Sequence, residues 1–354
     1  MLRLTPADRL RFGQVLPGEI CGSFGGGEAN VCVSLARLGL KSRFLTALPK
    51  NLIVDALFSE LKSHGVDVSK ILKTNFGRLG IYFTETGSNQ RSSNVVYDRE
   101  FSAVSMAQPD DYDFDAMLEG VDWLHLTGIT PALSESGFLS TLAIANKAKK
   151  LNIPISLDVN YRNKLWKWRP DTEQKSLARE CMTPLASIAS VIICNEADAS
   201  DVFGIAAKNV SFETGKFDAG AYTEVAHKLS QQFTNLEKIA ITLRESISAD
   251  HNNWGAVLLD TGTGRTFFAP SCEEGVYKPY EIRNIVDRIG GGDSFCAGLI
   301  YALNSNDYSA PEDAVAFAAA ASCLKHSIYG DFNLCSLSEI FSLLQGDSSG
   351  RIKR

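Results

Sequence analysis

The feature that most constrains the fold is an alternation of short apolar runs with longer amphipathic segments. Parallel strands need a crossover connection, and a helix of ten or more residues supplies one. The alternation therefore predicts an α/β fold whose mostly parallel central sheet is covered by helices. The expected strands and helices are Phe44–Thr46, 51–64, Trp123–Thr127, 134–150, Ile155–Asp158, 171–182, Val191–Cys194, a helix from about Glu196, 219–233 and Lys238–Leu243, with three helical segments after residue 293.

One region breaks this alternation. Two short strand-like runs, Gly80–Glu85 and Asn94–Tyr97, are joined by a polar turn at 87–90. Together with the segment around 12–23, they predict a small sheet outside the main one. We expect this β lid to comprise about residues 10–24 and 78–103 and to cover a site or form a dimer contact. The alternative is a surface hairpin without a role.

Composition narrows the classes of function. The chain has 354 residues, and its formal charge is 35 − 41 = −6, which argues against a chain-wide nucleic-acid surface. No apolar run approaches the ~20 residues that cross a bilayer, and no secretory signal is visible. The eight cysteines include no CxxC pair, so we expect reduced thiols in a cytoplasmic protein rather than disulfides or a zinc site. We expect one domain over 1–345 and a polar tail over 346–354.

A run of three glycines, Gly290, Gly291 and Gly292, precedes Asp293 and an apolar helical segment. Glycines let main-chain N–H groups converge without Cβ obstruction, and the start of a helix adds positive potential. The pattern therefore predicts an anion site, most naturally for phosphate. A carboxylate at this position can accept a proton from an attacking hydroxyl, although capping of the helix is the alternative role for Asp293. The run is neither a GxxxxGK[ST] loop nor a GxGxxG fingerprint.

An earlier glycine run, Gly25-Gly26-Gly27, is the first along the chain; it opens an amphipathic helix and is weak evidence by itself. The two runs together are more specific. GGGEANVCVSLARLG early and DRIGGGDSFCAGLIYAL late resemble the two signatures of the PfkB, or ribokinase-like, sugar kinase family. The resemblance covers nearly the whole chain and implies a three-layer fold with a mostly parallel sheet and a β lid. It also implies ATP and Mg²⁺ as cosubstrate and cofactor, with Asp293 as the catalytic base and Gly290, Gly291 and Gly292 as the anion hole.

Two segments between the glycine runs resemble the nucleotide-binding part of the family. Asn195-Glu-Ala-Asp198 is similar to its NxxE motif, which organises the magnesium-bound phosphates. Because Asp198 stands where Glu is usual, its shorter carboxylate favours a water-mediated role, and no residue is assigned as a direct metal ligand. Thr242 and Arg244 fall where the family has a glycine-containing nucleotide loop. Arg244 replaces that glycine, and either contacts a phosphate or pairs with a surface carboxylate.

Other segments resemble the 2-keto-3-deoxygluconate kinases of the family. The similar segments are Tyr97-Asp-Arg99, Gly128-Ile-Thr130, Asp158-Val-Asn-Tyr-Arg162 with Lys164-Leu-Trp166, and 326–333. A sugar acid carries a carboxylate, and arginine matches it with paired hydrogen bonds. The resemblance implies a sugar-acid pocket whose lining residues are Gly27, Tyr82, Tyr97, Arg99, Ile129, Arg162 and Asp293.

The resemblance also marks a departure at the amino terminus. Family members usually begin with a strand that ends in a Gly-Glu step just before the segment that here starts at Met1. We therefore expect the first strand of the central sheet to be missing from this sequence. A core strand left out would expose two sheet edges and remove main-chain partners.

The expected reaction is transfer of the γ-phosphoryl group of ATP to the terminal hydroxyl of 2-keto-3-deoxygluconate. One rival is a PfkB kinase for a neutral ketose such as fructose. Another is a catalytically silent homologue that binds a sugar acid or nucleotide. Small-molecule ligands are expected, rather than nucleic acid or membrane, and the lid implies a homo-oligomer by resemblance. The gluconate or galactonate configuration of the acceptor and a requirement for a monovalent cation stay open.

Overall fold

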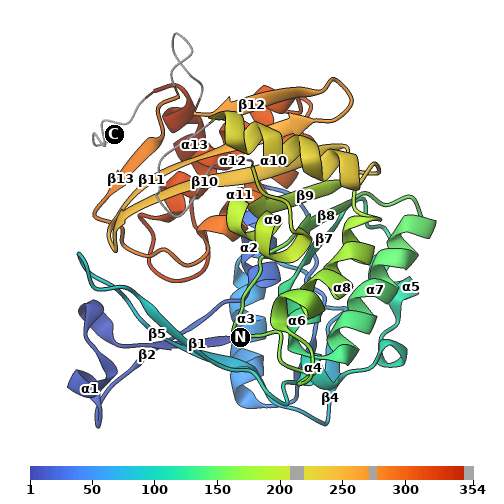
Figure 1. Cartoon of the computed structure of the whole chain (residues 1–354). Coiled ribbons are helices and arrows are strands. Elements are labelled where there is room, and N and C mark those ends of the chain that lie inside the picture. The colour runs from blue at the N-terminus through green and yellow to red at the C-terminus, as the bar shows by residue number, and fades with distance from the viewer. Residues whose placement is uncertain (208–218, 271–276, 347–354) are drawn as a thin grey trace.

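The computed structural model describes residues 1–207, 219–270 and 277–346, and shows a three-layer α/β body with a small sheet projecting from it (Figure 1). The polar tail predicted for 346–354 falls almost entirely outside the described residues. Within the described part, no helix has the length and apolar character needed to span a bilayer. The described cysteines are free thiols, as expected.

Seven strands form the central sheet, in the order β12-β11-β10-β9-β8-β7 with β13 paired to β11. The neighbours β7, β8, β9 and β10 are parallel, whereas β11, β12 and β13 join by antiparallel pairing. This confirms the mostly parallel sheet. The strands are β7 (Leu124–Thr127), β8 (Ile155–Asp158), β9 (Val191–Asn195), β10 (Lys238–Ser248), β11 (His251–Asp260), β12 (Arg265–Ala269) and β13 (Tyr280–Arg283).

Helices cover both faces of this sheet. Alternate residues of a strand point to opposite faces, so each strand contributes to two separate apolar cores. In β9, Ile192 packs in a core with α7, α8, α9 and α10, while Ile193 packs in a core with α2, α11, α12 and α13. The helices are α2 (Gly27–Arg37), α7 (Glu135–Lys150), α8 (Gln174–Ala186), α9 (Glu196–Phe203), α10 (Ala219–Gln232), α11 (Gly291–Leu303), α12 (Pro311–Lys325) and α13 (Leu337–Leu344).

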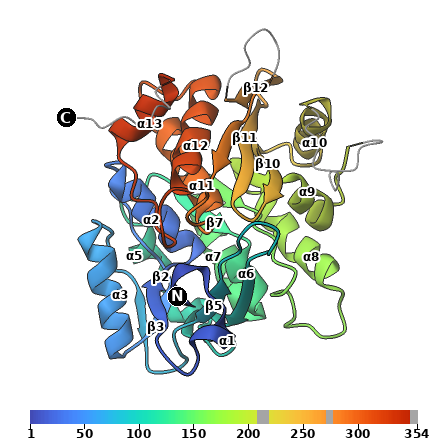
Figure 2. The same ribbon diagram turned by 90° about the vertical axis from the view of Figure 1, so that its left-hand side faces the viewer.

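Shorter elements surround this body. Helix α6 (Ile129–Leu133) follows the carboxyl end of β7, and α3 (Leu52–Ser63) belongs to the early part of the chain. Helix α11 lies beside both α2 and α12 (Figure 2). The strand expected at Phe44–Thr46 is displaced, because β3 begins at residue 47. The remaining elements are η1 (Ala7–Arg9), α1 (Phe12–Val15), β3 (Ala47–Pro49), α3 (Leu52–Ser63), β4 (Leu72–Thr74), α4 (Ala103–Met106), η2 (Pro109–Asp111), α5 (Phe114–Leu118) and α6 (Ile129–Leu133).

The β lid is a four-stranded sheet with the order β2-β1-β5-β6. The hairpin of β5 (Ile81–Glu85) and β6 (Asn94–Asp98) lies where the sequence predicted it. The first lid segment differs from the expected 10–24, because β1 (Leu2–Thr5) pairs with β5 and only β2 (Cys21–Phe24) lies within those bounds. Residues 12–15 form the short helix α1 instead. The amino-terminal segment is therefore part of the lid.

The central sheet has an open edge at β7, and the pair of β3 and β4 forms a separate sheet. Among the described strands, β7 is the last on its side, and β3 pairs only with β4. A cavity of about 910 Å³ lies here, lined by residues of β7 and by residues 40–48.

Candidate active site

Parallel strands place their carboxyl ends at one edge of the sheet, where open α/β sheets bind ligands. Thr127 at the end of β7 lies in register with Asp158 at the end of β8. Asn195 at the end of β9 lies in register with Thr242 of β10. The sheet thereby brings residues from four expected segments to one edge.

The second glycine run forms a tight turn at the start of α11. Gly290 is the N-cap residue and has a left-handed conformation, with φ of 86°. A Cβ on Gly290 would lie 2.1 Å from the main-chain oxygen of Asp331, whereas one on Gly292 would meet no atom within 4 Å. Gly290 is therefore required by packing and conformation, and Gly292 leaves the start of the helix open. Its free N–H groups and helix dipole suit a phosphate group.

Asp293 lies in the first turn of α11 and is 9% exposed. Its Oδ2 accepts a hydrogen bond of 2.6 Å from Nδ2 of Asn30. Burial raises the pKa of Asp293 to about 6, although the bond from Asn30 lowers it. The N-cap residue of α11 is Gly290 rather than Asp293, and the side-chain hydrogen bond found for Asp293 in the described residues comes from Asn30. A carboxylate with this pKa is ionised near neutral pH and still basic enough to accept a proton.

The first glycine run faces the same carboxylate from α2. A Cβ on Gly27 would lie 3.6 Å from Oδ1 of Asp293. The next residue, Glu28, accepts hydrogen bonds from the hydroxyls of Thr127 and Thr130, at 2.6 and 3.0 Å. The two helix starts therefore meet at Asp293, and the bond from Asn30 connects them.

Two more buried carboxylates lie near Asp293. Burial and the carboxylates of Asp198 and Asp293 raise the pKa of Asp158 to about 8, and the charge of Arg162 opposes this. Burial raises the pKa of Asp198 to about 6, again against Arg162. Asn160 donates to Oδ2 of Asp158 at 3.1 Å. Arg162 itself is exposed at the mouth of the site, where its charge acts on all three carboxylates.

The nucleotide-side residues divide into two groups. Asn195 and Asp198 form a reciprocal cap at the start of α9, and Oδ1 of Asp198 also accepts from the N–H of Tyr161 at 3.2 Å. These bonds occupy both oxygens of Asp198, which fits an indirect role toward a metal ion. Arg244 is exposed on β10, near enough to Glu196 and Arg288 for its charge to affect both of their pKa values.

Oxygen ligands of the kind Mg²⁺ prefers are present at this edge. The described residues contain no cluster of three or more metal-binding side chains. Magnesium is usually held by one or two carboxylates together with substrate phosphates and water, and Asp158 and Asp198 are two buried carboxylates at this edge of the sheet.

The lid contributes Arg99 and its neighbours. The guanidinium of Arg99 lies over the ring of Tyr97, with Cζ 5.3 Å from the centroid. Its Nε and Nη1 are shielded from solvent and have no hydrogen-bond partner among the described residues. Burial lowers the pKa of Arg99, and the charge of Arg162 acts in the same direction. A buried guanidinium with unused N–H groups is a binding site for an anion.

Ile129 and Tyr82, which were also predicted for the pocket, lie in different surroundings. Ile129 opens α6 beside Thr127, and it lines the same cavity as Arg99. Tyr82 is buried in the lid and donates its hydroxyl hydrogen bond to Oδ1 of Asp331, at 2.6 Å. Its polar end is thus engaged with the protein.

The sequence analysis did not assign Glu28, Asn30 or Asp158 to the site, although all three lie within the quoted motifs. The signal available was position alone. Glu28 and Asn30 fall in the first turn of a helix that follows glycines, and Asp158 ends a strand.

A glycine turn with room for a phosphate group, a buried carboxylate in the first helical turn and a lid bearing an arginine with unused N–H groups suit an α/β phosphotransferase. The profile of the pfkB family carbohydrate kinases matches residues 13–333. The chain belongs to this family, and is a phosphotransferase with an alcohol group as acceptor.

Individual relatives agree. The chain is 29% identical to a 2-dehydro-3-deoxygalactonokinase of Haloferax volcanii, over 99% of this chain and 96% of that protein. It is 25% identical to a 2-dehydro-3-deoxygluconokinase of Bacillus subtilis, over 87% and 82%. Among solved structures, the 2-dehydro-3-deoxygluconokinase of Thermotoga maritima superposes with a TM-score of 0.86 at 38% identity, covering 98% of this chain and 97% of that one.

Proposed function

We propose that the chain phosphorylates the terminal hydroxyl of 2-keto-3-deoxygluconate, using ATP, to give the 6-phosphate. The proposal is carried by the buried carboxylate of Asp293 together with the shielded Nε and Nη1 of Arg99, which have no hydrogen-bond partner among the described residues. Asp293 suits deprotonation of a hydroxyl, and Arg99 suits a substrate carboxylate. The names of the relatives from B. subtilis and T. maritima support the same substrate.

The reaction would proceed by in-line transfer. Asp293 would accept the proton of the terminal hydroxyl while the hydroxyl oxygen bonds to the γ-phosphorus. At the same time, the bond between the γ-phosphorus and the oxygen that bridges it to ADP would break, and ADP would leave. The N–H groups at the start of α11 would stabilise the charge on the transferring group. Bound Mg²⁺ would screen the β- and γ-phosphates, held through water by Asn195 and Asp198, with Thr242 and Arg244 on the nucleotide side.

The substrate would lie between the lid and the start of α2. Arg99 and Arg162 would bind its carboxylate, while Gly27, Tyr97 and Ile129 would line the sugar chain. Lys164 supports this closure, because its Nζ donates to the main-chain oxygen of Val95 in the lid at 3.2 Å. Tyr82 would hold the lid through the hydrogen bond of its hydroxyl to Asp331, rather than offer that hydroxyl to the substrate.

The test is release of ADP from Mg-ATP with 2-keto-3-deoxygluconate, fructose or ribose. We expect release with the sugar acid alone. Release with fructose at equal efficiency would establish the neutral-ketose rival. Ligand binding in a thermal-shift assay without ADP release would establish the silent homologue.

A matched pair of variants sharpens the test. Arg99→Ala and Arg162→Ala should raise the KM for the sugar acid and leave that for Mg-ATP unchanged. Arg283→Ala is the control, because Arg283 is exposed on β13, pairs with Glu281 and is not among the residues that line the cavity of Arg99. An unchanged KM in both Arg99 and Arg162 variants would remove the carboxylate from the substrate assignment.

A second acceptor, the galactonate-derived epimer, is favoured by the identity to the H. volcanii relative over almost the full length of both chains. Comparing kcat/KM for the two epimers decides between them. The proposal also includes a homo-oligomer joined through the lid, where Val96 is 62% exposed. Sedimentation of Val96→Lys against the unaltered protein tests it, and an unchanged molar mass would contradict assembly through this face.

A further inference from the structure

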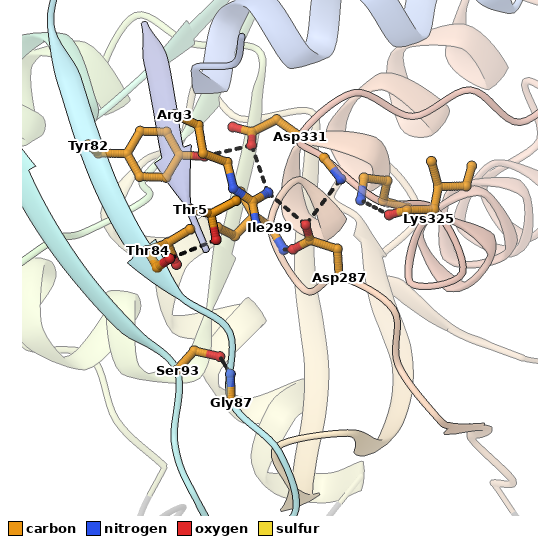
Figure 3. Close-up of polar contacts among 12 residues, drawn as sticks. Arg3, Thr5, Tyr82, Thr84, Gly87, Ser93, Asp287, Ile289, Lys325 and Asp331 are labelled. Atoms are coloured by element: carbon orange, nitrogen blue, oxygen red, sulfur yellow. Dashed lines mark hydrogen bonds and ion pairs between the residues drawn. The ribbon is translucent and has the colours of Figure 1, made fainter. Parts of the chain in front are cut away.

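A cluster of four buried charges lies directly behind the anion-binding turn (Figure 3). Arg3 and Lys325 have no exposed surface, and Asp287 and Asp331 are 3% exposed each. Nη1 of Arg3 donates to Oδ2 of Asp287 at 2.6 Å and to Oδ1 of Asp331 at 3.2 Å. None of these residues was assigned a role from the sequence.

The carboxylate of Asp287 holds the main chain on both sides of this turn. Asp287 accepts from the N–H of Ile289 and of Gly330, each at 3.1 Å. Both of these N–H groups belong to segments that border the turn. Residue 289 directly precedes Gly290, and residue 330 directly precedes Asp331. The main-chain oxygen of Asp331 lies so close to Gly290 that a Cβ there would be 2.1 Å from it.

Lys325 is the second cation of this cluster. Its Cε would lie 3.2 Å from a Cβ on Gly290, so the side chain extends beneath the turn from the end of α12. Nζ donates to the main-chain oxygen of Ile328 at 3.0 Å, and this is the one hydrogen bond found for it in the described residues. Burial lowers the pKa of Lys325, but the carboxylates of Asp287 and Asp331 oppose that shift and favour the ammonium form.

The carboxylates would otherwise work against the anion site. Two negative charges below a phosphate-binding turn reduce its positive potential, and Arg3 alone balances one of them. Because Arg3 is bonded to both carboxylates, the charge of the second one falls to Lys325, whose ammonium group interacts with both of them through space.

We propose that Lys325 is a positioning residue that serves as a fixed internal cation beneath the Gly290 turn. It neutralises the second carboxylate, fixes the turn and keeps the anion site positive, so that no monovalent cation is needed there. This inference rests on the proposed function only where turnover is measured.

The test replaces Lys325 with methionine, which keeps the chain length and removes the charge. Lys325→Met should lower kcat by at least about tenfold, equal to ~1.4 kcal/mol of transition-state stabilisation, with a smaller change in the KM for the sugar acid. Its melting temperature should also fall. Ammonium or potassium chloride should restore part of both losses relative to choline chloride at equal ionic strength, because a small cation can replace the missing charge.

The control is Lys238→Met, which removes a lysine whose Nζ lies 3.0 Å from Oδ1 of Asp260, at the opposite end of β10. Neither its turnover nor its melting temperature should respond to the choice of cation. A Lys325→Met protein that is equally insensitive would overturn the proposal.

Two measurements keep the inference testable by other means. The unaltered protein should have the same melting temperature and Mg-ADP affinity in potassium, ammonium and choline chloride, and a marked gain in potassium alone would overturn the proposal. If Lys325→Met does not fold, Lys325→Arg should retain cation-independent Mg-ADP binding. These readouts need no acceptor, so failure of the proposed kinase reaction would be seen separately.

Discussion

The two glycine runs have the same local sequence, and in each of them Asp331 limits the space around one glycine. Each opens a helix with a glycine at positive φ, 132° at Gly26 and 86° at Gly290. Asp331 lies between them. A Cβ on Gly25 would meet its side chain at 1.9 Å, and a Cβ on Gly290 would meet its main-chain oxygen at 2.1 Å. In each run one glycine is thus needed for close packing.

The runs differ in what their last glycine faces. Gly27 faces the carboxylate of Asp293 and the end of β7, whereas Gly292 faces open space. The first run therefore borders the proposed sugar-acid pocket, and the second leaves room for a phosphate. Identical local sequence thus gives two different binding surfaces, because the residues packed around each run decide what is left open.

The largest expected effect comes from removing the carboxylate that both runs share. Asp293→Asn keeps the shape and cannot accept the proton, so kcat should fall by about 10²- to 10⁴-fold. Binding of Mg-ADP and of the sugar acid should change little, which calorimetry can check. Turnover close to that of the unaltered protein would exclude Asp293 as the base.

The next largest effect is expected from backbone strain in the later run, at Gly290. Gly290→Ala forces a side chain into a left-handed residue, at a cost of about 1–3 kcal/mol before the collision with Asp331 is counted. We expect a lower melting temperature and weaker binding of Mg-ADP. Gly264→Ala is the matched control for conformation, because Gly264 also has positive φ, but a Cβ there would meet no atom within 4 Å. Equal losses of Mg-ADP binding in both variants would show that the position beneath the phosphate is unimportant.

A smaller and reciprocal effect is expected at the last glycines. Gly27→Ala should raise the KM for the sugar acid, and Gly292→Ala should raise the KM for Mg-ATP, because each methyl group would enter a different binding surface. Steady-state kinetics with each substrate varied in turn measures this exchange. A rise in the same KM for both variants would contradict the division between the runs.

The smallest effect is in the pH dependence. Asp293 accepts a proton only when ionised, so kcat/KM should rise with pH through about 6, its raised pKa, and then level off. Asn30→Ala removes the bond that lowers this pKa, and the rise should move to higher pH. A profile unaffected by Asn30→Ala would argue that another group controls it.

The same shift has a consequence for stability. A carboxyl group whose pKa is higher in the folded protein favours folding at low pH and loses that contribution as pH rises through the folded value. For Asp158 this loss extends to about pH 8. The unaltered protein should thus lose more stability than Asp158→Asn between pH 5 and 8, as unfolding in urea can measure.

Elements with local signals were predictable from the sequence. Helix α7 lies within the predicted range 134–150, and Ser134 caps its start, with Oγ accepting from the N–H of Gly137 at 2.9 Å. Strand β8 has the bounds expected for it. Local spacing, caps and turn residues were enough for these elements.

Contacts between distant segments were not predictable in this way. Arg3 reaches Asp287 across 284 residues, and nothing near Arg3 indicates that its segment joins the lid. The antiparallel strands β11 to β13 were not assigned either, since no helix separates them. For Arg244, the structure shows a neighbouring Glu196 but does not decide between its two expected roles.

The open edge of the central sheet has a consequence for amide hydrogen exchange. In β7, the N–H of Leu124 bonds to Pro154, and the N–H of Gly128, just after the strand, bonds to Asp158. Alternation along a parallel pair turns the N–H groups of His125 and Thr127 toward the cavity instead. Neighbouring amides of β7 should thus exchange at very different rates. Those that face β8 should exchange only when the sheet opens, whereas the others should exchange from the native state.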